Sequence, residues 1–306
     1  MITREPTSIK HLVLQNGIFY ILALFIAFGL KYHYSQARSD DLIWVLGPTA
    51  ALVEHISGIS FEKEVHTGYV NHKHRIIIAP SCAGVNFFII AFCLVVFSFI
   101  HHLPRKRVKL FWLTIGMLSA YVLTILVNAL RIISSIYFYN ADIYCGWITP
   151  QRVHRLEGIV IYFFFLCLYY MIINKGIHHY CRRTAAKRKS ANRSNLTQSD
   201  YLRWACAGLI PLFWYGLITL GIPLVNAAYR GRRIRFVEHS GMVISGCLVV
   251  IAAIFFLQMG WQRIGNTIKR LAKKYIRYTT QVLYKSRFML FYTQRHNKLR
   301  IRPLNR

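Results

Sequence analysis

This chain has few acidic residues and no pair of cysteines in CxxC spacing. Its 306 residues include ten Asp and Glu against thirty-nine Lys and Arg, which gives a formal charge of +29. Because the seven cysteines include no CxxC pair, they do not form a zinc pattern. The first apolar run lacks a small-residue cleavage site, so we expect it to stay in the protein as a membrane span and not to be removed as a signal peptide.

Long apolar stretches alternate along the chain with dense basic runs, and 55% of the residues are hydrophobic. Soluble domains rarely separate these residue types so completely, so the pattern predicts a membrane protein. Anionic lipid at the inner leaflet explains the basic residues, because it attracts each Lys or Arg near the surface by about 1 kcal/mol. We therefore expect anionic lipid as a partner and no nucleic acid.

Six apolar segments of about 18–20 residues predict membrane-spanning helices. They lie at about 12–30, 83–100, 110–130, 156–173, 204–224 and 241–258. A weaker segment at 42–59 contains Pro48, Glu54 and His55, and the sequence leaves open whether this segment spans the membrane or is re-entrant or interfacial. The predicted fold class is all-α, a polytopic integral membrane helical bundle of about six to eight transmembrane helices.

Clusters of Lys and Arg predict which loops are cytoplasmic. Such clusters occur at 101–109, at 174–203 and after Gly260. This orientation places the start of 83–100, the end of 110–130 and the start of 156–173 together on the extracytoplasmic face. The basic loop at 230–235 falls on that face too and is the one cluster that disagrees with the rule.

The spans and basic runs divide the chain into four predicted regions. These are a catalytic membrane core at 1–175, a basic cytoplasmic linker at 176–203, an additional transmembrane hairpin at 204–258 and a basic amphipathic tail at 259–306. Within the tail, apolar residues of 261–283 recur at spacings of three and four with basic residues between them. This pattern predicts a helix lying on the inner leaflet, or one packed on its own cytoplasmic loops.

Cys82 stands where a polar turn meets the apolar segment at 83–100. Only the thiolate form of cysteine is a strong nucleophile, and a helix N-terminus favours an anion. The backbone N–H groups of Ala83 and Gly84 are candidates for an oxyanion hole, because the absence of a side chain at Gly84 permits close approach of a substrate. Ser81 is a candidate helix cap.

Two further candidates lie at the ends of the following spans. His154 is the candidate base that accepts the thiol proton, and Arg131 is a permanent cation that could stabilise an oxyanion or bind a substrate carboxylate or carbonyl. Asn128 lies one turn from Arg131 and could orient it or bind substrate. Glu157 lies one turn from His154 and could orient the imidazole or pair with Arg155. Each residue also has a structural interpretation as an interfacial anchor or a packing residue, so the functional case rests on their meeting on one face.

Three sequence blocks resemble the signature blocks of the exosortase/archaeosortase family. They are Pro80-Ser-Cys-Ala-Gly84, the pair Asn128 and Arg131, and the pair His154 and Gly158. The amino-acid sequence around Cys82 is most similar to that of the exosortase K branch. The blocks cover about 80–160, and residues 204–306 lie outside them.

The resemblance implies a cysteine peptidase or transpeptidase of the bacterial inner membrane, with its active site facing the periplasm. Cys82, Arg131 and His154 would be its catalytic residues, and Gly158 would support them. Its partners would be exported proteins with a C-terminal sorting signal made of a motif, a transmembrane helix and a basic cluster. The enzyme would cleave near the motif and transfer the new carboxyl end to an unknown acceptor, with no cofactor and no metal.

Three other functions fit parts of the sequence. His66, His72 and His74 could bind zinc or copper. A transporter would place polar groups at mid-membrane, where Glu54 and His55 are the candidates. A non-catalytic membrane scaffold would not need Cys82. Metal analysis and a Cys82→Ala variant discriminate between these functions.

Overall fold

A computed structural model describes the chain at residues 9–141, 145–146, 148–186, 200–226, 230 and 233–299. Helices contain most of these residues, and within them six helices are long and apolar enough to cross a membrane. The prediction of an all-α, multi-pass membrane protein is therefore confirmed. The chain forms two compact units, residues 1–251 and residues 252–306.

The helices follow the predicted apolar segments but extend beyond several of them. In the described residues they are α1 (Ile9–Gln36), α2 (Ile43–Ser57), α3 (Val85–Phe99), α4 (Lys106–Asn140), α5 (Pro150–Ala186), α6 (Asp200–Gly216), α7 (Ile222–Val225) and α8 (Arg233–Leu299). The predicted boundary after residue 175 falls inside α5, and the one after residue 258 falls inside α8. Of the predicted linker, residues 187–199 lie outside the described residues.

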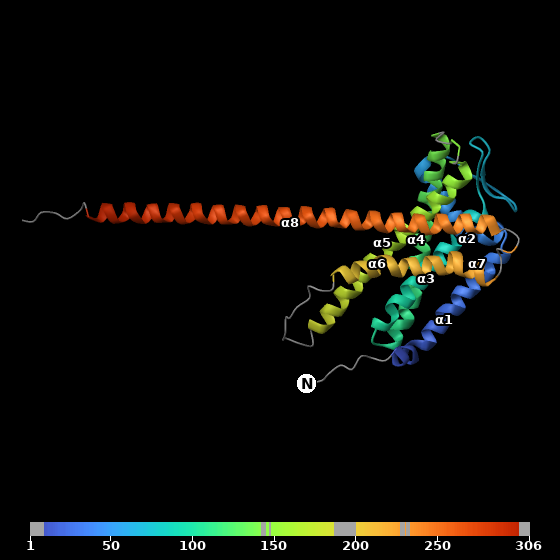
Figure 1. Cartoon of the computed structure of the whole chain (residues 1–306), viewed down its shortest axis with the longest axis horizontal. Coiled ribbons are helices and arrows are strands. Elements are labelled where there is room, and N and C mark those ends of the chain that lie inside the picture. Colours follow the sequence, from blue (N-terminus) through green and yellow to red (C-terminus); the bar gives the residue numbers. More distant parts are fainter. Residues whose placement is uncertain are drawn as a thin grey trace, which may run out of the picture. The chain divides into compact units, whose positions relative to one another are not determined.

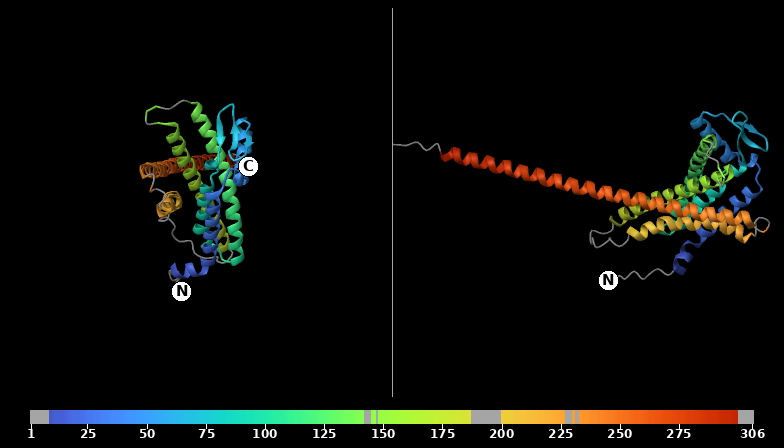
Figure 2. Two further views of the ribbon diagram at one scale, coloured as in Figure 1. Left: turned by 90° about the vertical axis from the view of Figure 1, so that its right-hand side faces the viewer. Right: turned by 45° about the horizontal axis from the view of Figure 1, so that its top comes forward.

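Helix α3 is the centre of the first unit. It packs against α1, α4, α5 and α6 and is buried along most of its length. A helix that is apolar on all sides has no face suited to water, so the other helices surround it. Figures 1 and 2 show α1, α3, α4 and α5 side by side, with a small β-sheet at one end of the bundle. The neighbours of α3 present apolar side chains outward, such as Phe25 of α1 and Phe111 of α4, which suits a lipid surround.

Helix α2 has fifteen residues, which is too short to cross a hydrocarbon core that needs about twenty. It packs on α4, where the Tyr121 hydroxyl donates a hydrogen bond to the Trp44 carbonyl at 2.6 Å. Pro48 lies inside it, and it ends at Gly58, whose φ of 71° is the left-handed conformation common after a helix. Of the possibilities that the sequence left open for 42–59, the structure therefore favours a segment that does not span the membrane.

A three-stranded antiparallel sheet follows α2, and the sequence analysis did not predict it. Its strands are β1 (Glu62–Glu64), β2 (Gly68–Asn71) and β3 (Ile76–Ile78), in the order β1-β2-β3. The sheet contacts α2 through β2. Strands of three or four residues are too short to show a reliable alternation of apolar and polar residues.

Carboxylates attach the sheet to the helical bundle. Asp40, which follows α1, accepts a hydrogen bond from the His66 backbone N–H at 3.2 Å and pairs with the Lys63 ammonium at 3.4 Å. The backbone N–H of His66, followed by Lys63, lowers the pKa of the Asp40 carboxyl below its usual value. Glu54, at the end of α2, accepts a hydrogen bond from the Phe61 backbone N–H.

The first unit has two chemically different ends. At the sheet end, α1 and α4 finish and α3 and α5 begin. At the opposite end lies the basic connection from α3 to α4, which we call the basic end and which comprises residues 101–109. Helix α4 has 35 residues, so it is about 52 Å long and exceeds a hydrocarbon core of about 30 Å. Counting about twenty residues from Leu110 places Arg131 near the membrane boundary at the sheet end.

Candidate active site

Cys82 closes a short 3₁₀ turn, Pro80–Cys82, that connects β3 to α3. The Cys82 N–H donates to the Ala79 carbonyl at 2.8 Å, and the Ala83 N–H donates to the Pro80 carbonyl at 3.1 Å. The Ala83 N–H therefore already has a partner and differs from the free oxyanion donor that the sequence predicted. Helix α3 begins only at Val85, and its N-cap position is Gly84 instead of the predicted Ser81.

Gly84 holds the start of α3 against α4 and α5. Its φ of 70° lies in the left-handed region, which favours glycine. A Cβ at this position would meet Thr124 and Asn128 at 3.3 Å and the Tyr162 hydroxyl at 3.4 Å. The space that the sequence analysis assigned to a substrate backbone is thus occupied by neighbouring helices, and Gly84 positions the Cys82 turn.

A hydrogen-bonded chain links the Cys82 turn to Arg131. Asn128 is fully buried, and its side-chain amide donates to the Cys82 carbonyl. The Tyr162 hydroxyl donates to the Asn128 side-chain carbonyl at 2.8 Å and accepts from the Arg131 Nη1 at 3.2 Å. Asn128 therefore orients both the turn and, through Tyr162, the guanidinium group.

Helix α5 forms a cradle for the guanidinium group of Arg131. His154, Gly158 and Tyr162 follow at spacings of four residues, so they lie on one face of α5. His154 and Tyr162 are hydrogen-bonded to the two ends of the guanidinium. Between them, a Cβ at Gly158 would lie only 2.9 Å from the Arg131 Nε. Gly158 therefore supports the site by leaving space for Arg131.

His154 lies in a second chain of hydrogen bonds. Its Nε2 is 2.7 Å from the Arg131 Nη2, and its Nδ1 is 3.0 Å from the Ser135 Oγ. The Ser135 hydroxyl also contacts Glu157 Oε2 at 2.7 Å. Arg131 can only donate, so Nε2 must accept, and the proton of a neutral imidazole lies on Nδ1. Nδ1 then donates to Ser135, and Ser135 donates to Glu157.

This arrangement identifies how Glu157 acts on the imidazole. It orients His154 through Ser135 and not directly, and among the described residues it forms no ion pair with Arg155. The result is that the Nε2 lone pair of His154, the one a general base needs, points at Arg131. For His154 to take a proton from Cys82, its Nε2 has to release Arg131 and accept a hydrogen bond from the Cys82 thiol instead.

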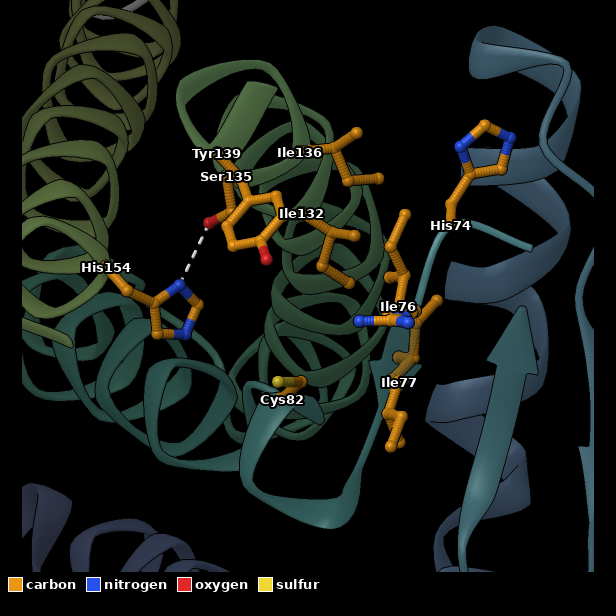
Figure 3. A pocket seen from close by; sticks show the side chains of 11 residues that line it. His74, Ile76, Ile77, Cys82, Ile132, Ser135, Ile136, Tyr139 and His154 are labelled. Carbon is orange, nitrogen blue, oxygen red and sulfur yellow. Dashed lines mark hydrogen bonds between the residues drawn. The ribbon is translucent and has the colours of Figure 1, made fainter. Parts of the chain in front are cut away.

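Cys82 and His154 line the same cavity of about 230 Å³. Figure 3 shows the imidazole of His154 on one side of this cavity, Ile76 and Ile77 on the other, and the thiol of Cys82 between them, with Ser135 hydrogen-bonded to the imidazole. The other walls are β3 and one face of α4 that includes Ile132 and Tyr139. We call this space the thiol cavity. A second cavity, of about 320 Å³, lies between α4 and α5 on the Glu157 side of the imidazole.

Arg131 is a buried cation whose direct partners are neutral. It is 9% exposed, and within the described part of the chain it forms no salt bridge. Its guanidinium has five N–H groups, and its Nε is buried without a hydrogen-bond partner. Hydrogen bonds through Tyr162 and Asn128 connect it to the backbone of Cys82. Because no carboxylate of the described residues contacts the guanidinium directly, the position is suited to stabilise negative charge that forms nearby.

Ser135 and Tyr162 are site residues that the sequence analysis missed. On α4, Thr124, Asn128, Arg131 and Ser135 follow at spacings of four, three and four residues, which forms a polar stripe on one face of an apolar helix. That stripe was a readable signal for Ser135. Tyr162 lies within an apolar, aromatic run, and its spacing from His154 and Gly158 was its one signal.

The residues behind the rival predictions have structural partners. His72 contacts Glu64 at 2.7 Å and His66 contacts Asp40 at 3.2 Å, both on exposed loops. His74 lies apart from them at the thiol cavity, and the described residues contain no cluster of three or more potential metal ligands. Glu54, one of the polar groups considered for a transporter, accepts a hydrogen bond from the Phe61 backbone N–H.

Comparison with known proteins gave no match to a family model, a curated protein or a solved structure.

Proposed function

We propose that this protein is a membrane-embedded cysteine peptidase or transpeptidase of the exosortase type. It would cleave C-terminal sorting signals of exported proteins and transfer the new carboxyl end to an acceptor. The observation that carries the proposal is the position of Arg131: a buried cation with neutral hydrogen-bond partners, connected through Tyr162 and Asn128 to the backbone of Cys82. Cys82 and His154 line one cavity beside it.

The chemistry follows from these positions. His154 Nε2 takes the thiol proton, and the Cys82 sulfur attacks the carbonyl carbon of the scissile peptide bond. Arg131 stabilises the thiolate and then the oxyanion of the tetrahedral intermediate. His154 returns the proton to the leaving amine, which leaves a thioester on Cys82. Water or an acceptor amine then attacks the thioester, and the thiol is restored.

The hydrogen bond between Arg131 and His154 gives this scheme a resting state. Before attack, the guanidinium holds the Nε2 lone pair and keeps the imidazole neutral and oriented. For attack, the guanidinium turns from Nε2 toward the sulfur, so that Nε2 accepts the thiol proton as negative charge forms on sulfur beside the cation. The Ser135 contact stays in place on the other ring nitrogen and preserves the tautomer.

The proposed location is the bacterial inner membrane, with the sheet end toward the periplasm. The basic end, with Arg105, Lys106, Arg107 and Lys109, would then face the cytoplasm, as the positive-inside rule requires. Exported substrates would reach the thiol from the periplasmic side after translocation.

The test compares the C-termini of exported host proteins that carry a C-terminal apolar span and a basic cluster. Mass spectrometry would be applied to cells that express wild-type protein, Cys82→Ala or Cys145→Ala. Cys145 is an exposed thiol that lines neither of the two cavities, and it serves as the matched control. Shortening in the wild type and in Cys145→Ala but not in Cys82→Ala supports the proposal. Equal processing in all three contradicts it and favours a transporter or scaffold.

A further inference from the structure

The sheet has an edge beside the proposed nucleophile. In the order β1-β2-β3, strand β3 pairs with β2 on one side, and no other strand of the described residues pairs with it on the other. Only three residues separate Ile78, the last residue of β3, from Cys82. All three residues of β3 line the thiol cavity together with Cys82. Figure 3 shows β3 passing beside the thiol, with Ile76 and Ile77 at the cavity wall.

The unpaired edge presents the backbone groups of Ile77. The carbonyl of Ile78 lies against Gly68 of β2, where a Cβ would clash with it, so Ile78 directs its backbone toward β2. Successive residues of an antiparallel strand direct their backbone groups to opposite edges. The N–H and C=O of Ile77 therefore point away from β2. Within the described part of the chain, neither group has a hydrogen-bond partner outside the sheet.

An unpaired edge with free backbone groups attracts another extended chain. Proteins that recognise extended peptides use such edges by adding the peptide as a strand, which gives affinity through the main chain and not through its sequence. A peptidase needs the same geometry, because an extended backbone presents its carbonyl carbon for attack. The edge of β3 and the thiol of Cys82 share one cavity, so both needs are met at one place.

We propose that β3 binds the segment of the substrate that contains the scissile bond as a fourth, edge strand, through the N–H and C=O of Ile77. The inference rests on the proposed peptidase function and deepens it by naming how the substrate is held. The substrate at this site is an extended polypeptide, unwound at the point of cleavage, with its transmembrane helix beyond the segment that pairs.

The lining of the thiol cavity indicates which side chains this segment carries. His74 and Arg75 flank β3, His154 lies opposite, and no Asp or Glu belongs to the lining among the described residues. Ile77 is 53% exposed and offers an apolar contact. A neutral or acidic segment is favoured here, whereas a basic one would meet like charge. The basic cluster of a sorting signal would therefore lie away from the thiol cavity.

Two variants at one position separate backbone pairing from side-chain contact. Ile77→Pro removes the N–H that points away from β2, and proline is tolerated where a strand's N–H faces outward. Ile77→Ala removes most of the side chain but keeps the N–H. The rate of Cys82-dependent C-terminal shortening would be measured in cells by mass spectrometry, and labelling of Cys82 by iodoacetamide would report whether the turn is intact.

Pairing predicts that Ile77→Pro lowers the rate about tenfold or more, the size expected when one hydrogen bond is lost and its partner is left unsatisfied. Ile77→Ala should stay within about threefold of wild type. Wild-type rates in Ile77→Pro with normal labelling would overturn the edge-strand inference and leave the peptidase proposal standing. If the wild-type protein itself shows no Cys82-dependent shortening, both the edge-strand inference and the peptidase proposal are overturned.

A second measurement applies if Ile77→Pro disturbs the fold and labelling of Cys82 changes. Synthetic peptides that span the mapped cleavage junction would carry one N-methyl group each, at successive amides, and would be offered to the wild-type protein. Pairing with Ile77 predicts a sharp loss of cleavage at one amide position and small effects at the two amides beside it. A uniform response along the peptide would overturn the inference.

Discussion

Helix α4 carries two buried cations, and they differ in what surrounds them. Lys109, in its first turn, is 8% exposed, donates to Asn16 and lies over the Phe19 ring. Arg131, about six turns further along, is 9% exposed, contacts Tyr162 and His154 and lies over the Tyr162 ring. The spacing between them is near the roughly 30 Å thickness of a bilayer's hydrocarbon core.

Burial and neutral partners are common to both cations, so neither property alone identifies a catalytic site. Lys109 lies in the basic end, where a lysine can extend its ammonium group toward the membrane surface. Arg131 contacts an imidazole that lines one cavity together with the Cys82 thiol. The function of a buried cation therefore depends on the reactive groups that lie near it.

The largest expected effect comes from removing the charge at Arg131. Arg131→Gln should lower Cys82-dependent cleavage by about 10²–10³-fold, the range found when an oxyanion donor is removed. Lys109→Gln should leave the rate within about twofold, because no reacting group lies near it. Rates of C-terminal shortening by mass spectrometry would measure both variants. Equal losses of cleavage rate in the two variants would contradict the difference between the two cations and would show that both only stabilise the fold.

Ser135→Ala is expected to have the next largest effect. It disconnects Glu157 from the imidazole and leaves the ring free to adopt the other tautomer. We expect a loss of about 10–100-fold in cleavage rate, within the range for general acid–base catalysis. Ser119→Ala, on the same helix but bonded to Tyr169, is the matched control. If both serine variants cleave at the wild-type rate, Ser135 is only a packing residue.

Gly158→Ala tests the cradle of Arg131 by adding one methyl group. The new Cβ would lie 2.9 Å from the Arg131 Nε, so the guanidinium has to move. A small misplacement of this kind should cost about tenfold or more in cleavage rate. Gly176→Ala adds the same methyl group to α5 where nothing lies within 4 Å, and it should behave as wild type. An active Gly158→Ala variant would show that the position of Arg131 is not critical.

Asp40→Asn is expected to have the smallest effect and concerns a partly exposed anion instead of a buried cation. The pKa of Asp40 is lowered in the folded protein, so the ionised carboxylate stabilises the attachment of the sheet. This stabilisation is present above the ordinary pKa of 3.8 and is lost as the pH falls through the lowered value.

Hydrogen exchange of the backbone amides in the sheet would measure this effect. In the wild-type protein, protection of the His66 amide should fall as the pH drops below about 4, the ordinary range of an aspartate. In Asp40→Asn, protection should be low at all pH values and should not change in that window. A pH-dependent loss of the same size in the variant would assign it to other groups.

The helices could be predicted from the sequence, and so could the meeting of three site residues. Apolar runs as long as those of α3 and α4 are stable in a membrane as spanning helices, and the basic loops between the spans indicate which end of each helix is cytoplasmic. Cys82, Arg131 and His154 lie at successive ends on one side, and the structure brings them around one site.

The rest could not be predicted because it depends on contacts between segments far apart in the sequence. The sheet is too short to leave a periodic signal, and its place beside Cys82 depends on how β2 packs on α2. Nothing in the local sequence shows that the Ala83 N–H is already bonded to the Pro80 carbonyl. The role of Tyr162 depends on α4 and α5 facing each other, which spacing within one helix cannot reveal.

The proposed mechanism requires a thioester on Cys82, and this intermediate can be detected by mass spectrometry. Cells that express the wild-type protein would be quenched in acid, and the protein would be digested and analysed by mass spectrometry with and without hydroxylamine, which cleaves thioesters. We predict a peptide-derived mass on Cys82 that hydroxylamine removes, with none on Cys145. If Cys82 is found only as the free thiol while exported proteins are being shortened, Cys82 is not the nucleophile and the account is wrong.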